Sequence, residues 1–264
     1  MARVIIKLGG GLITDKTRYK SVFTDRIDEV SFVISKIIDL GHSVIVIHGA
    51  GSYGHIEAKK WSIGDGFDSD ISEHQYSAIE TIRADMSELN SMVIDSLERA
   101  GLRCHSLPPR DWVNGVGTSF SGDISIFKRG SDLPVPVSFG DVVEINDESR
   151  FGILSGDHLM VRLATELPDV LLCAFLLGDT EGLMSGPPGI EGSELIDVWN
   201  ESKGFIGEHN KGIDVTGGIH LKVQCASVIS HSAQQVWFID GRKPSRLLDI
   251  LSGIDVIGTR IVPG

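Results

Sequence analysis

The stretch Val44–His55 reads VIVIHGAGSYGH. Its first four residues are apolar and β-branched, which predicts a buried strand, and the glycines that follow predict a loop that opens a helix. The stretch Arg3–Gly11, RVIIKLGGG, repeats this order of a short apolar run and a glycine loop. Open α/β sheets bind their ligands where such strands end. The two stretches therefore predict a sheet with a binding site at its carboxyl edge.

The rest of the chain alternates helices with strands. Apolar residues recur at helical spacing at Ile27, Val30, Ile34, Ile37 and Ile38, which predicts a helix that Thr24 caps and Gly41 ends. Further helices are expected over 71–100, over about 156–167 and from about 217, and further strands near 103–107, 135–139, 170–177 and 236–239. This order indicates the α/β class: a three-layer αβα sandwich with a mainly parallel central sheet.

Two segments have the weakest pattern. They are 120–130 and 182–212, and the second is rich in glycine and polar residues. Long segments without regular structure in a compact domain are often functional lids. We therefore expect residues 182–212 to carry a mobile lid.

The composition excludes several classes of protein. Lys and Arg total 24 against 36 Asp and Glu, a net charge of −12, so the basic patch of a nucleic-acid surface is not expected. Hydrophobic residues make up 41% of the 264 residues, which excludes disorder as the main state. Cys104, Cys173 and Cys225 show no CxxC spacing, so neither a disulfide framework nor a structural zinc site is expected.

A membrane protein is not expected either. The apolar run Val170–Leu177 has eight residues, too few to cross a bilayer. The first residues lead directly into the apolar run over 3–8, without the pattern of a signal peptide. We expect a cytoplasmic protein with no membrane partner and no nucleic-acid partner.

Lys7 and the glycines Gly9, Gly10 and Gly11 form the first candidate ligand site. Glycines at a strand end let backbone N–H groups approach a polyphosphate without obstruction by a Cβ atom, and Lys7 adds an ammonium group beside them. A glycine turn with a solvated lysine is the plain structural alternative. The chain lacks the GxxxxGK[ST] pattern, so a Walker-type phosphate loop is excluded.

The loop from His48 to His55 is the second candidate. A helix N-terminus presents free N–H groups and the positive end of the helix dipole, and both favour an anion. Ala50 and Gly51 permit close approach of the backbone. His55 follows at the start of the helix, where it could donate a hydrogen bond to a phosphate oxygen. A structural histidine is the alternative for His55, while His48 is expected to pack at the strand end.

Three more segments have similar features. In Asp214–Gly218 (DVTGG), Thr216 is expected to cap a helix, with Lys222 one turn later on the same side. Gly178–Gly182 (GDTEG) follows a buried strand and is either a ligand loop or a turn with solvated acids. The segment Ser155–Asp157 (SGD) is expected to start a helix, with Asp157 as a cap or a polar anchor.

The distribution of lysines decides among these interpretations. Three strand ends carry glycine loops, and Lys7, Lys16 and Lys222 are spread among them. A chain with a net charge of −12 has little structural need for this arrangement. The simplest joint function is to hold two anionic groups end to end, which predicts a phosphoryl-transfer site.

Six motifs, in order along almost the whole chain, resemble those of the amino acid kinase family. They are KLGGG (7–11), ITDK (13–16), HGAGSYGH (48–55), SGD (155–157), DVTGG (214–218) with Lys222, and GTRI (258–261). Within the family, the histidine that ends the third motif makes the chain most similar to the isopentenyl phosphate kinases of the archaeal mevalonate route. The resemblance implies ATP-dependent phosphorylation of isopentenyl phosphate to isopentenyl diphosphate in isoprenoid biosynthesis, with Mg²⁺ as cofactor and a homodimer as assembly.

The resemblance also implies roles for single residues. Lys7, Lys16 and His55 are implied to be catalytic, with Lys16 as the lysine at the transition state. The acceptor is implied to contact Ala50, Gly54, His55, Gly156 and Asp157. The nucleotide is implied to contact Lys7, Gly9, Gly10, Gly11, Gly51, Asp179, Gly182, Gly218 and Lys222. No residue is assigned as a metal ligand.

The implied domain organisation is a single amino acid kinase domain over 1–264. Its N-terminal half, about 1–168, would bind the acceptor, and its C-terminal half, about 169–264, the nucleotide. Gly11, Tyr53 and Glu181 depart from the family pattern, which usually has Ser, Phe and Asp there. None of these departures removes a lysine or His55.

Other functions fit the same residues. One is a kinase for another small phosphate or phosphonate, similar to fosfomycin kinases, and another is a non-catalytic nucleotide-binding protein on the same fold. The three lysines argue against the binding protein, which would not need a cation at the point of transfer.

An isopentenyl tail requires an apolar wall. The helix over 71–100 is the expected wall, with Ile79, Ile82 and Met86 as candidates. An ordinary core position is the alternative for each of the three.

Overall fold

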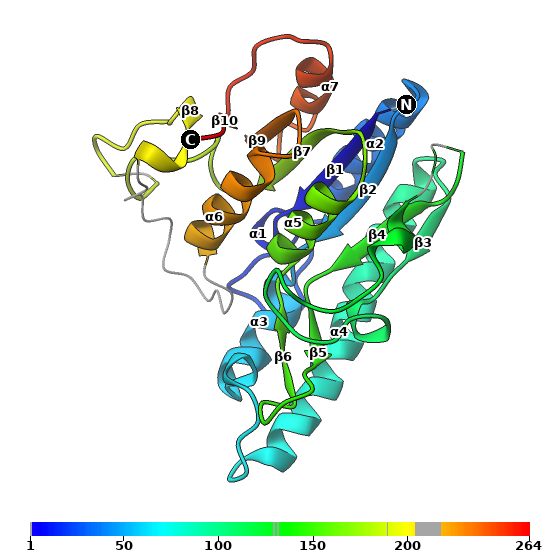
Figure 1. Ribbon diagram of the computed structural model, residues 1–264, viewed down its shortest axis with the longest axis vertical. Helices are drawn as coiled ribbons and strands as arrows, with labels where there is room; N and C mark the ends of the chain where they lie inside the picture. The colour runs from blue at the N-terminus through cyan, green and yellow to red at the C-terminus, as the bar shows by residue number, and fades with distance from the viewer. Residues whose placement is uncertain (1, 129, 131, 189, 204–217) are drawn as a thin grey trace.

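Strand β1 (Arg3–Leu8) lies in the middle of the central sheet (Figure 1). Helices cover this strand on both faces, so all six of its residues are buried, including the charged Arg3 and Lys7. It pairs in parallel with β2 (Ser43–His48) on one side and with β7 (Val170–Leu177) on the other. The computed structural model describes residues 2–264 except 129, 131, 189 and 204–217.

The sheet extends outward from these strands in the order β3-β4-β2-β1-β7-β9-β10-β8. Its pairs are parallel except for β9 with β10, which confirms the mainly parallel sheet. The outer strands are β3 (Cys104–Ser106), β4 (Val135–Phe139), β8 (Val198–Trp199), β9 (Gln235–Asp240) and β10 (Thr259–Ile261). A separate antiparallel hairpin joins β5 (Asp141–Glu144) to β6 (Phe151–Leu154).

Helices cover both faces of the sheet, which confirms the three-layer αβα arrangement (Figure 1). Val4 and Ile6 of β1 pack in one core with α2, α4 and α7, whereas Ile5 packs in another with α5 and α6. Successive residues of a strand point to opposite faces, so one strand serves both cores. The helices are α1 (Gly10–Ile13), α2 (Thr24–Asp39), α3 (Gly51–Lys60), α4 (Ser72–Arg99), α5 (Gly156–Glu166), α6 (Gly218–Ser230) and α7 (Arg246–Leu251). Short 3₁₀ helices are η1 (Ile63–Asp65), η2 (Pro109–Asp111), η3 (Ile124–Phe127) and η4 (Glu201–Lys203).

The structure corrects several predicted details. Phe23, not Thr24, occupies the N-cap of α2, and no side chain caps this helix. Gly10 and Gly11 begin the one-turn helix α1, so this glycine segment is not an open loop. Hairpin β5–β6, helix α7 and strands β8 and β10 were not predicted, because segments of two to six residues are too short to show a periodicity.

Some predictions fall partly outside the described residues. Thr216 and Gly217, at the predicted start of the last helix, lie there, and α6 is described from Gly218 onward. Of the predicted lid over 182–212, the described part contains β8 and η4, and residues 189 and 204–212 lie outside it. In the part of the chain that is described, no helix has the length and apolar character to span a membrane.

Candidate active site

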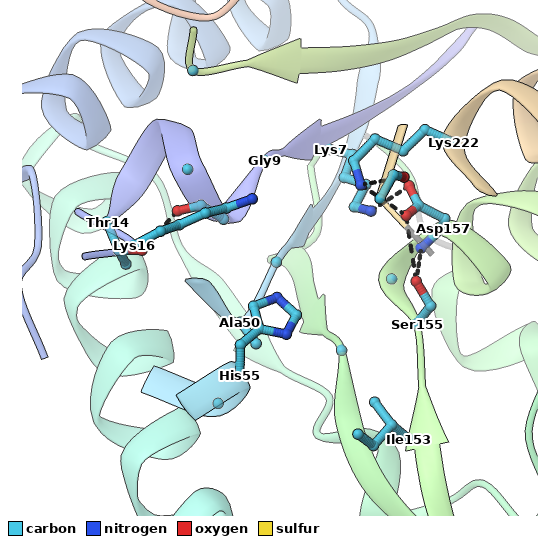
Figure 2. A pocket seen from close by; sticks show the side chains of 18 of the residues that line it. Lys7, Gly9, Thr14, Lys16, Ala50, His55, Ile153, Ser155, Asp157 and Lys222 are labelled. Atoms are coloured by element: carbon cyan, nitrogen blue, oxygen red, sulfur yellow. Dashed lines mark hydrogen bonds and ion pairs between the residues drawn. The ribbon is translucent and has the colours of Figure 1, made fainter. Parts of the chain in front are cut away.

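The carboxyl ends of β1, β2 and β7 border a cavity of about 940 Å³ (Figure 2). Gly9, Gly49 and Gly178 each follow one of these neighbouring strands, so they meet at one edge of the sheet and line the cavity. Gly156 and Gly218 reach the same cavity from the first turns of α5 and α6. The glycine segments that lie far apart in the sequence therefore belong to one site.

Close approach of two backbone segments explains part of this glycine content. A Cβ atom on Gly10 would lie 2.5 Å from the amide nitrogen of Gly51, and one on Gly49 would lie 2.7 Å from that of Gly10. These distances are shorter than any real Cβ contact, so the loops after β1 and β2 can pack together only without side chains. The packing places both loops against the same cavity, which Gly9, Gly10, Gly49 and Ala50 line.

Lys7, Asp157 and Lys222 form a charged cluster in the cavity wall (Figure 2). Lys7 Nζ donates a short hydrogen bond to Asp157 Oδ1, and Lys222 Nζ lies 3.4 Å from Asp157 Oδ2. Ser155 caps α5, because its Oγ accepts from the amide of Asp157 at 3.2 Å. Of the two roles predicted for Asp157, the structure shows the polar anchor and assigns the cap to Ser155.

Burial and charge set the protonation of this cluster. The Lys7 side chain is only 5% exposed, and burial lowers its pKa to about 8 against the opposing attraction of Asp157. Burial would raise the pKa of Asp157, but the ammonium groups of Lys222 and Lys7 hold it below its usual range. Two lysines facing one carboxylate leave a net positive charge, which an anionic ligand would neutralise.

Lys16 lines the cavity on the side of α1, across from this cluster (Figure 2). Its aliphatic part lies over Gly11, where an added Cβ atom would be 3.1 Å from Lys16 Cε. Gly11 therefore lets the Lys16 side chain lie close against α1. Cations on two sides of one cavity are what the transfer of a phosphoryl group between two anions requires.

His55 enters the cavity from α3 (Figure 2). Ala50, the N-cap of α3, and Gly54 line the cavity beside it, so the helix N-terminus and the imidazole face the same space. His48 has a different role, because it is fully buried and stacks on Phe139. Burial lowers the pKa of His48 to about 4, which confirms the packed strand-end residue that was predicted.

The wall of the cavity near His55 is apolar. Five residues, which we call the apolar slot, line it and pack in one core: Ala58, Ile82, Met86, Val142 and Ile153. They come from α3, α4 and hairpin β5–β6. All three predicted wall residues, Ile79, Ile82 and Met86, are buried in one core, and of these Ile82 and Met86 also border the cavity.

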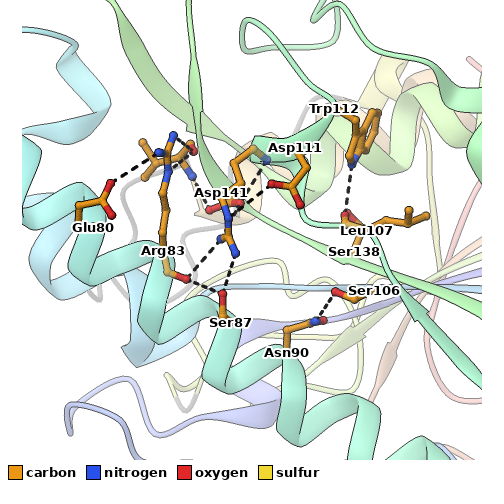
Figure 3. A network of polar contacts seen from close by, with 12 residues as sticks. Glu80, Arg83, Ser87, Asn90, Ser106, Leu107, Asp111, Trp112, Ser138 and Asp141 are labelled. Carbon is orange, nitrogen blue, oxygen red and sulfur yellow. Dashed lines mark hydrogen bonds and ion pairs between the residues drawn. The ribbon is translucent and has the colours of Figure 1, made fainter.

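A polar network attaches hairpin β5–β6 to α4 (Figure 3). Arg83 of α4 donates to the carbonyl oxygen of Val142 through Nη2 at 3.1 Å. Arg110 donates to Ser87 Oγ at 2.8 Å and lies 3.4 Å from Asp141 Oδ2. Burial raises the pKa of Asp141 to about 6, and Arg110 opposes this shift. The network ties the backbone of Val142, which lines the apolar slot, to α4.

Most of the predicted site residues line this cavity. They are Lys7, Gly9, Gly10, Gly11, Lys16, Ala50, Gly54, His55, Gly156, Asp157, Asp179, Gly218 and Lys222. Gly51 and Gly182 are not among the lining residues. Gly51 has a φ of 51°, and a Cβ atom there would lie 1.9 Å from Thr14 Oγ1, while one on Gly182 would lie 2.5 Å from Thr259 Oγ1. The structure gives these two glycines packing roles, and their nucleotide contacts stay predictions.

Sequence reasoning missed the contribution of hairpin β5–β6 to the site. Each of its strands has four residues, too few to show an alternation. Gly140 is the sequence feature that could have indicated this contribution. It follows β4 as Gly9 and Gly49 follow their strands, and it lines the same cavity. Phe23 and Arg26 of the α2 start also line the cavity, and no motif pointed to them.

Comparison with known proteins identifies the family. The model of the amino acid kinase family matches residues 2–240. The isopentenyl phosphate kinase of Thermoplasma acidophilum is 35% identical over 94% of this chain and 95% of its own length. That of Methanocaldococcus jannaschii is 29% identical over 97% of both chains. The crystal structure of an isopentenyl phosphate kinase substrate complex is 30% identical, has a TM-score of 0.81 and matches 99% of this chain and 100% of its own. Because the family match runs from β1 to the end of β9 and includes every strand end that borders the cavity, this chain belongs to the amino acid kinase family.

Proposed function

We propose that this protein transfers the γ-phosphoryl group of ATP to isopentenyl phosphate and forms isopentenyl diphosphate. The observation that carries the proposal is one cavity in which Lys7, Lys16, Lys222 and His55 adjoin an apolar slot. A substrate with an anionic head and a branched hydrocarbon tail complements both parts. The relatives that match nearly the whole chain are isopentenyl phosphate kinases, which supports the same substrate here.

The acceptor binds with its phosphate at the N-terminus of α3. Ala50 offers its backbone N–H near the positive end of the helix dipole, Gly54 leaves the space beside it clear of a side chain, and His55 donates a hydrogen bond to a phosphate oxygen. The tail lies in the apolar slot. A phosphate monoester has a second pKa of about 6 and is mostly dianionic at neutral pH, so the attacking oxygen needs no general base.

The nucleotide phosphates bind on the side of β7 and α6. Gly178, Asp179, Gly218 and Lys222 line this part of the cavity, and Lys7 faces Lys222 across Asp157. Asp157 fixes the positions of both ammonium groups, so their charges are already oriented when the phosphates arrive. Preorganised charge of this kind stabilises a transition state without reorganisation at the moment of reaction.

Lys16 neutralises the group in transfer. Its place across the cavity from the Lys7–Asp157–Lys222 cluster lets it approach the phosphoryl group between donor and acceptor. Positioning and charge stabilisation are the main contributions that a protein makes to phosphoryl transfer. In this proposal Lys7 and Lys16 neutralise the moving group, and the glycine N–H groups align the two phosphates.

Magnesium accompanies the nucleotide in this proposal. In the described residues no group of three His, Cys, Asp or Glu side chains could hold a metal ion. Mg²⁺ needs no such group, because it commonly takes one or two carboxylates and completes its shell with phosphate oxygens and water. Asp179, which lines the cavity after β7, fits that role, whereas Asp157 is engaged with two lysines. When bound, Mg²⁺ would neutralise charge on the donor phosphates.

The proposal includes the organisation of the chain. The apolar slot and His55 come from residues within 1–168, and Gly178, Asp179, Gly218 and Lys222 come from 169–264. This distribution supports a single domain over 1–264 with an acceptor half and a nucleotide half, although Lys7 of the first half faces the nucleotide side. A homodimer in the cytoplasm and a role in isoprenoid biosynthesis rest on the family resemblance, and light scattering on the purified protein would test the assembly.

A panel of acceptors tests the proposal. Coupled measurement of ADP release with isopentenyl phosphate, fosfomycin and small polar phosphate monoesters should give the highest kcat/KM for isopentenyl phosphate, and ³¹P NMR should show a diphosphate product. The slot disfavours fosfomycin, because a compact polar phosphonate would leave its apolar side chains without a partner. Faster turnover of fosfomycin than of isopentenyl phosphate would contradict the proposal.

A further inference from the structure

The loop that carries Lys16 is closed at its base. Thr14 and Val22 form an antiparallel bridge, and the amide of Asp15 donates to the carbonyl of Ser21 at 2.9 Å. Residues 14–22, which we call the Lys16 loop, therefore project as one unit from the end of α1. The position of Lys16 depends on how the far side of this loop is held.

Tyr19 and Lys20 attach the far side of the loop to α4. The hydroxyl of Tyr19 donates a short hydrogen bond to Asp85 Oδ2, and Lys20 Nζ lies 2.9 Å from Asp85 Oδ1. Lys20 also pairs with Glu88 at 2.5 Å. Asp85 is 5% exposed, whereas the Glu88 side chain is 46% exposed. A buried carboxylate is costly without partners, so Asp85 favours the conformation in which Tyr19 and Lys20 reach it.

A third contact joins the loop to α3. Tyr53 Oη donates to the carbonyl oxygen of Lys20 at 3.3 Å, and Lys20 has a left-handed backbone with a φ of 52°. Tyr53 precedes His55 by two residues on the same helix. The hydroxyl that distinguishes this tyrosine from the family's frequent phenylalanine thus bonds to the loop of Lys16.

We propose that Asp85 is a positioning residue that, through Tyr19 and Lys20, holds the Lys16 loop in the geometry required for phosphoryl transfer. We call these three residues the latch. Asp85 does not line the cavity, while its neighbour on α4, Met86, lines the apolar slot. The latch therefore ties Lys16 to the same helix that contacts the acceptor tail. This inference rests on the proposed function, because it assigns Lys16 to the transferred group.

Replacement of Asp85 by asparagine tests the latch. Asp85→Asn keeps the shape of the side chain but removes the charge that holds Lys20. We expect kcat with ATP and isopentenyl phosphate to fall about tenfold or more, with both KM values changed less than about twofold, because a small displacement of a catalytic group lowers kcat strongly. Asp95→Asn is the matched control, since Asp95 is an exposed residue of the same helix, and it should leave kcat unchanged.

A double-mutant cycle separates positioning from stability. If Asp85 acts through Lys16, Asp85→Asn should lower kcat no further in a Lys16→Ala background. Equal fold losses in both backgrounds, or an unchanged kcat in folded Asp85→Asn, would overturn the proposal. Should Asp85→Asn fail to fold, Tyr19→Phe removes one hydroxyl from a half-exposed ring, and we expect a loss of about threefold in kcat with the same dependence on Lys16.

Hydrogen–deuterium exchange tests the latch independently of the proposed function. Amides of residues 15–22 should exchange faster in Asp85→Asn or Tyr19→Phe than in the unmodified protein, while those of β1 stay protected. Unchanged exchange in the Lys16 loop would overturn the latch whatever the acceptor is. Absence of isopentenyl phosphate turnover in the unmodified protein would instead refute the proposed function.

Discussion

The cavity has a charged edge, formed by Lys7, Lys16 and Lys222, and an apolar slot beside it. The residues of the two regions are distributed differently along the sequence. Lys7 and Lys222 lie at a strand end and in a helix start beside glycine motifs, and Lys16 follows the glycine segment of α1 within a short contiguous motif. The slot takes one or two residues each from α3, α4 and hairpin β5–β6, and none of these slot residues belongs to a motif. Chemistry at this site is thus encoded locally, whereas the shape that receives the substrate tail is assembled from distant parts of the chain.

Substitutions in the two regions should also affect different kinetic constants. Preorganised cations that meet developing charge act mainly on kcat, because they contribute more in the transition state than in the ground state. Apolar contacts contribute about 0.8 kcal/mol per buried CH₂ in both states, so they act on binding and on the choice of acceptor. Substitutions in each region can confirm or break this division.

Lys16→Ala should have the largest effect. If Lys16 meets the group in transfer mainly in the transition state, kcat and kcat/KM should fall together by about 10²- to 10³-fold, the range for losing one preorganised donor. Steady-state kinetics with both substrates measures this. Lys59→Ala, on the exposed side of α3, is the matched control and should change neither constant. A higher KM for ATP with kcat preserved would show that Lys16 binds only the ground-state nucleotide.

His55→Ala should have the next largest effect, and on the acceptor alone. Loss of a hydrogen bond to a charged group costs about 1.5–3 kcal/mol, which corresponds to a fall of roughly ten- to a hundredfold in kcat/KM for isopentenyl phosphate. The affinity for ATP, measured by calorimetry, should change little. His105→Ala removes an exposed imidazole from β3 and provides the control. Unchanged acceptor kinetics in His55→Ala would assign this residue a structural role.

The slot should respond in acceptor choice. Ile82→Ala and Met86→Ala enlarge it, so both variants should phosphorylate longer prenyl phosphates such as geranyl phosphate better than the unmodified protein does. Each extra CH₂ that fits contributes up to about 0.8 kcal/mol.

Ile79→Ala is the control for Ile82→Ala and Met86→Ala. It removes a similar buried side chain from α4 outside the cavity, so it should cost about 2–5 kcal/mol of stability without a change in acceptor profile. Melting temperatures and acceptor panels on all three variants separate the two effects. Longer-chain activity gained by Ile79→Ala as well would remove the distinction between slot and core.

The smallest expected effect is proton uptake by Lys7 when ATP binds. The pKa of Lys7 is about 8 in the free protein, so the ammonium group loses its proton as the pH rises through this value. Bound phosphates favour the charged form, so ATP binding at about pH 8.5 should take up a fraction of a proton. Calorimetry in two buffers of different ionisation enthalpy measures the uptake. Lys7→Arg carries a permanent charge and should abolish it, and equal uptake in both proteins would place the titrating group elsewhere.

The sequence alone determined the charged edge of this protein. The runs before Gly9, Gly49 and Gly178 are strands, the order of elements predicts a mainly parallel sheet, and the carboxyl ends of such strands meet at one edge. Lys7, Lys16 and Lys222 accordingly surround one cavity, as the sequence predicts. The sequence is sufficient for this prediction because each glycine motif is contiguous in the chain, and the direction of the parallel strands brings the motifs to one edge of the sheet.

Tertiary structure decided the rest. Ile79, Ile82 and Met86 share one apolar face of α4, and a helical pattern cannot tell which of them faces a cavity and which the core, since both surroundings are apolar. The same holds for Asp157, whose pairing with two lysines requires α5 and α6 to lie beside β1, and for Asp85, whose partners lie about 65 residues away. What a side chain does at such positions depends on the element that packs against it, and that information is absent from the local sequence.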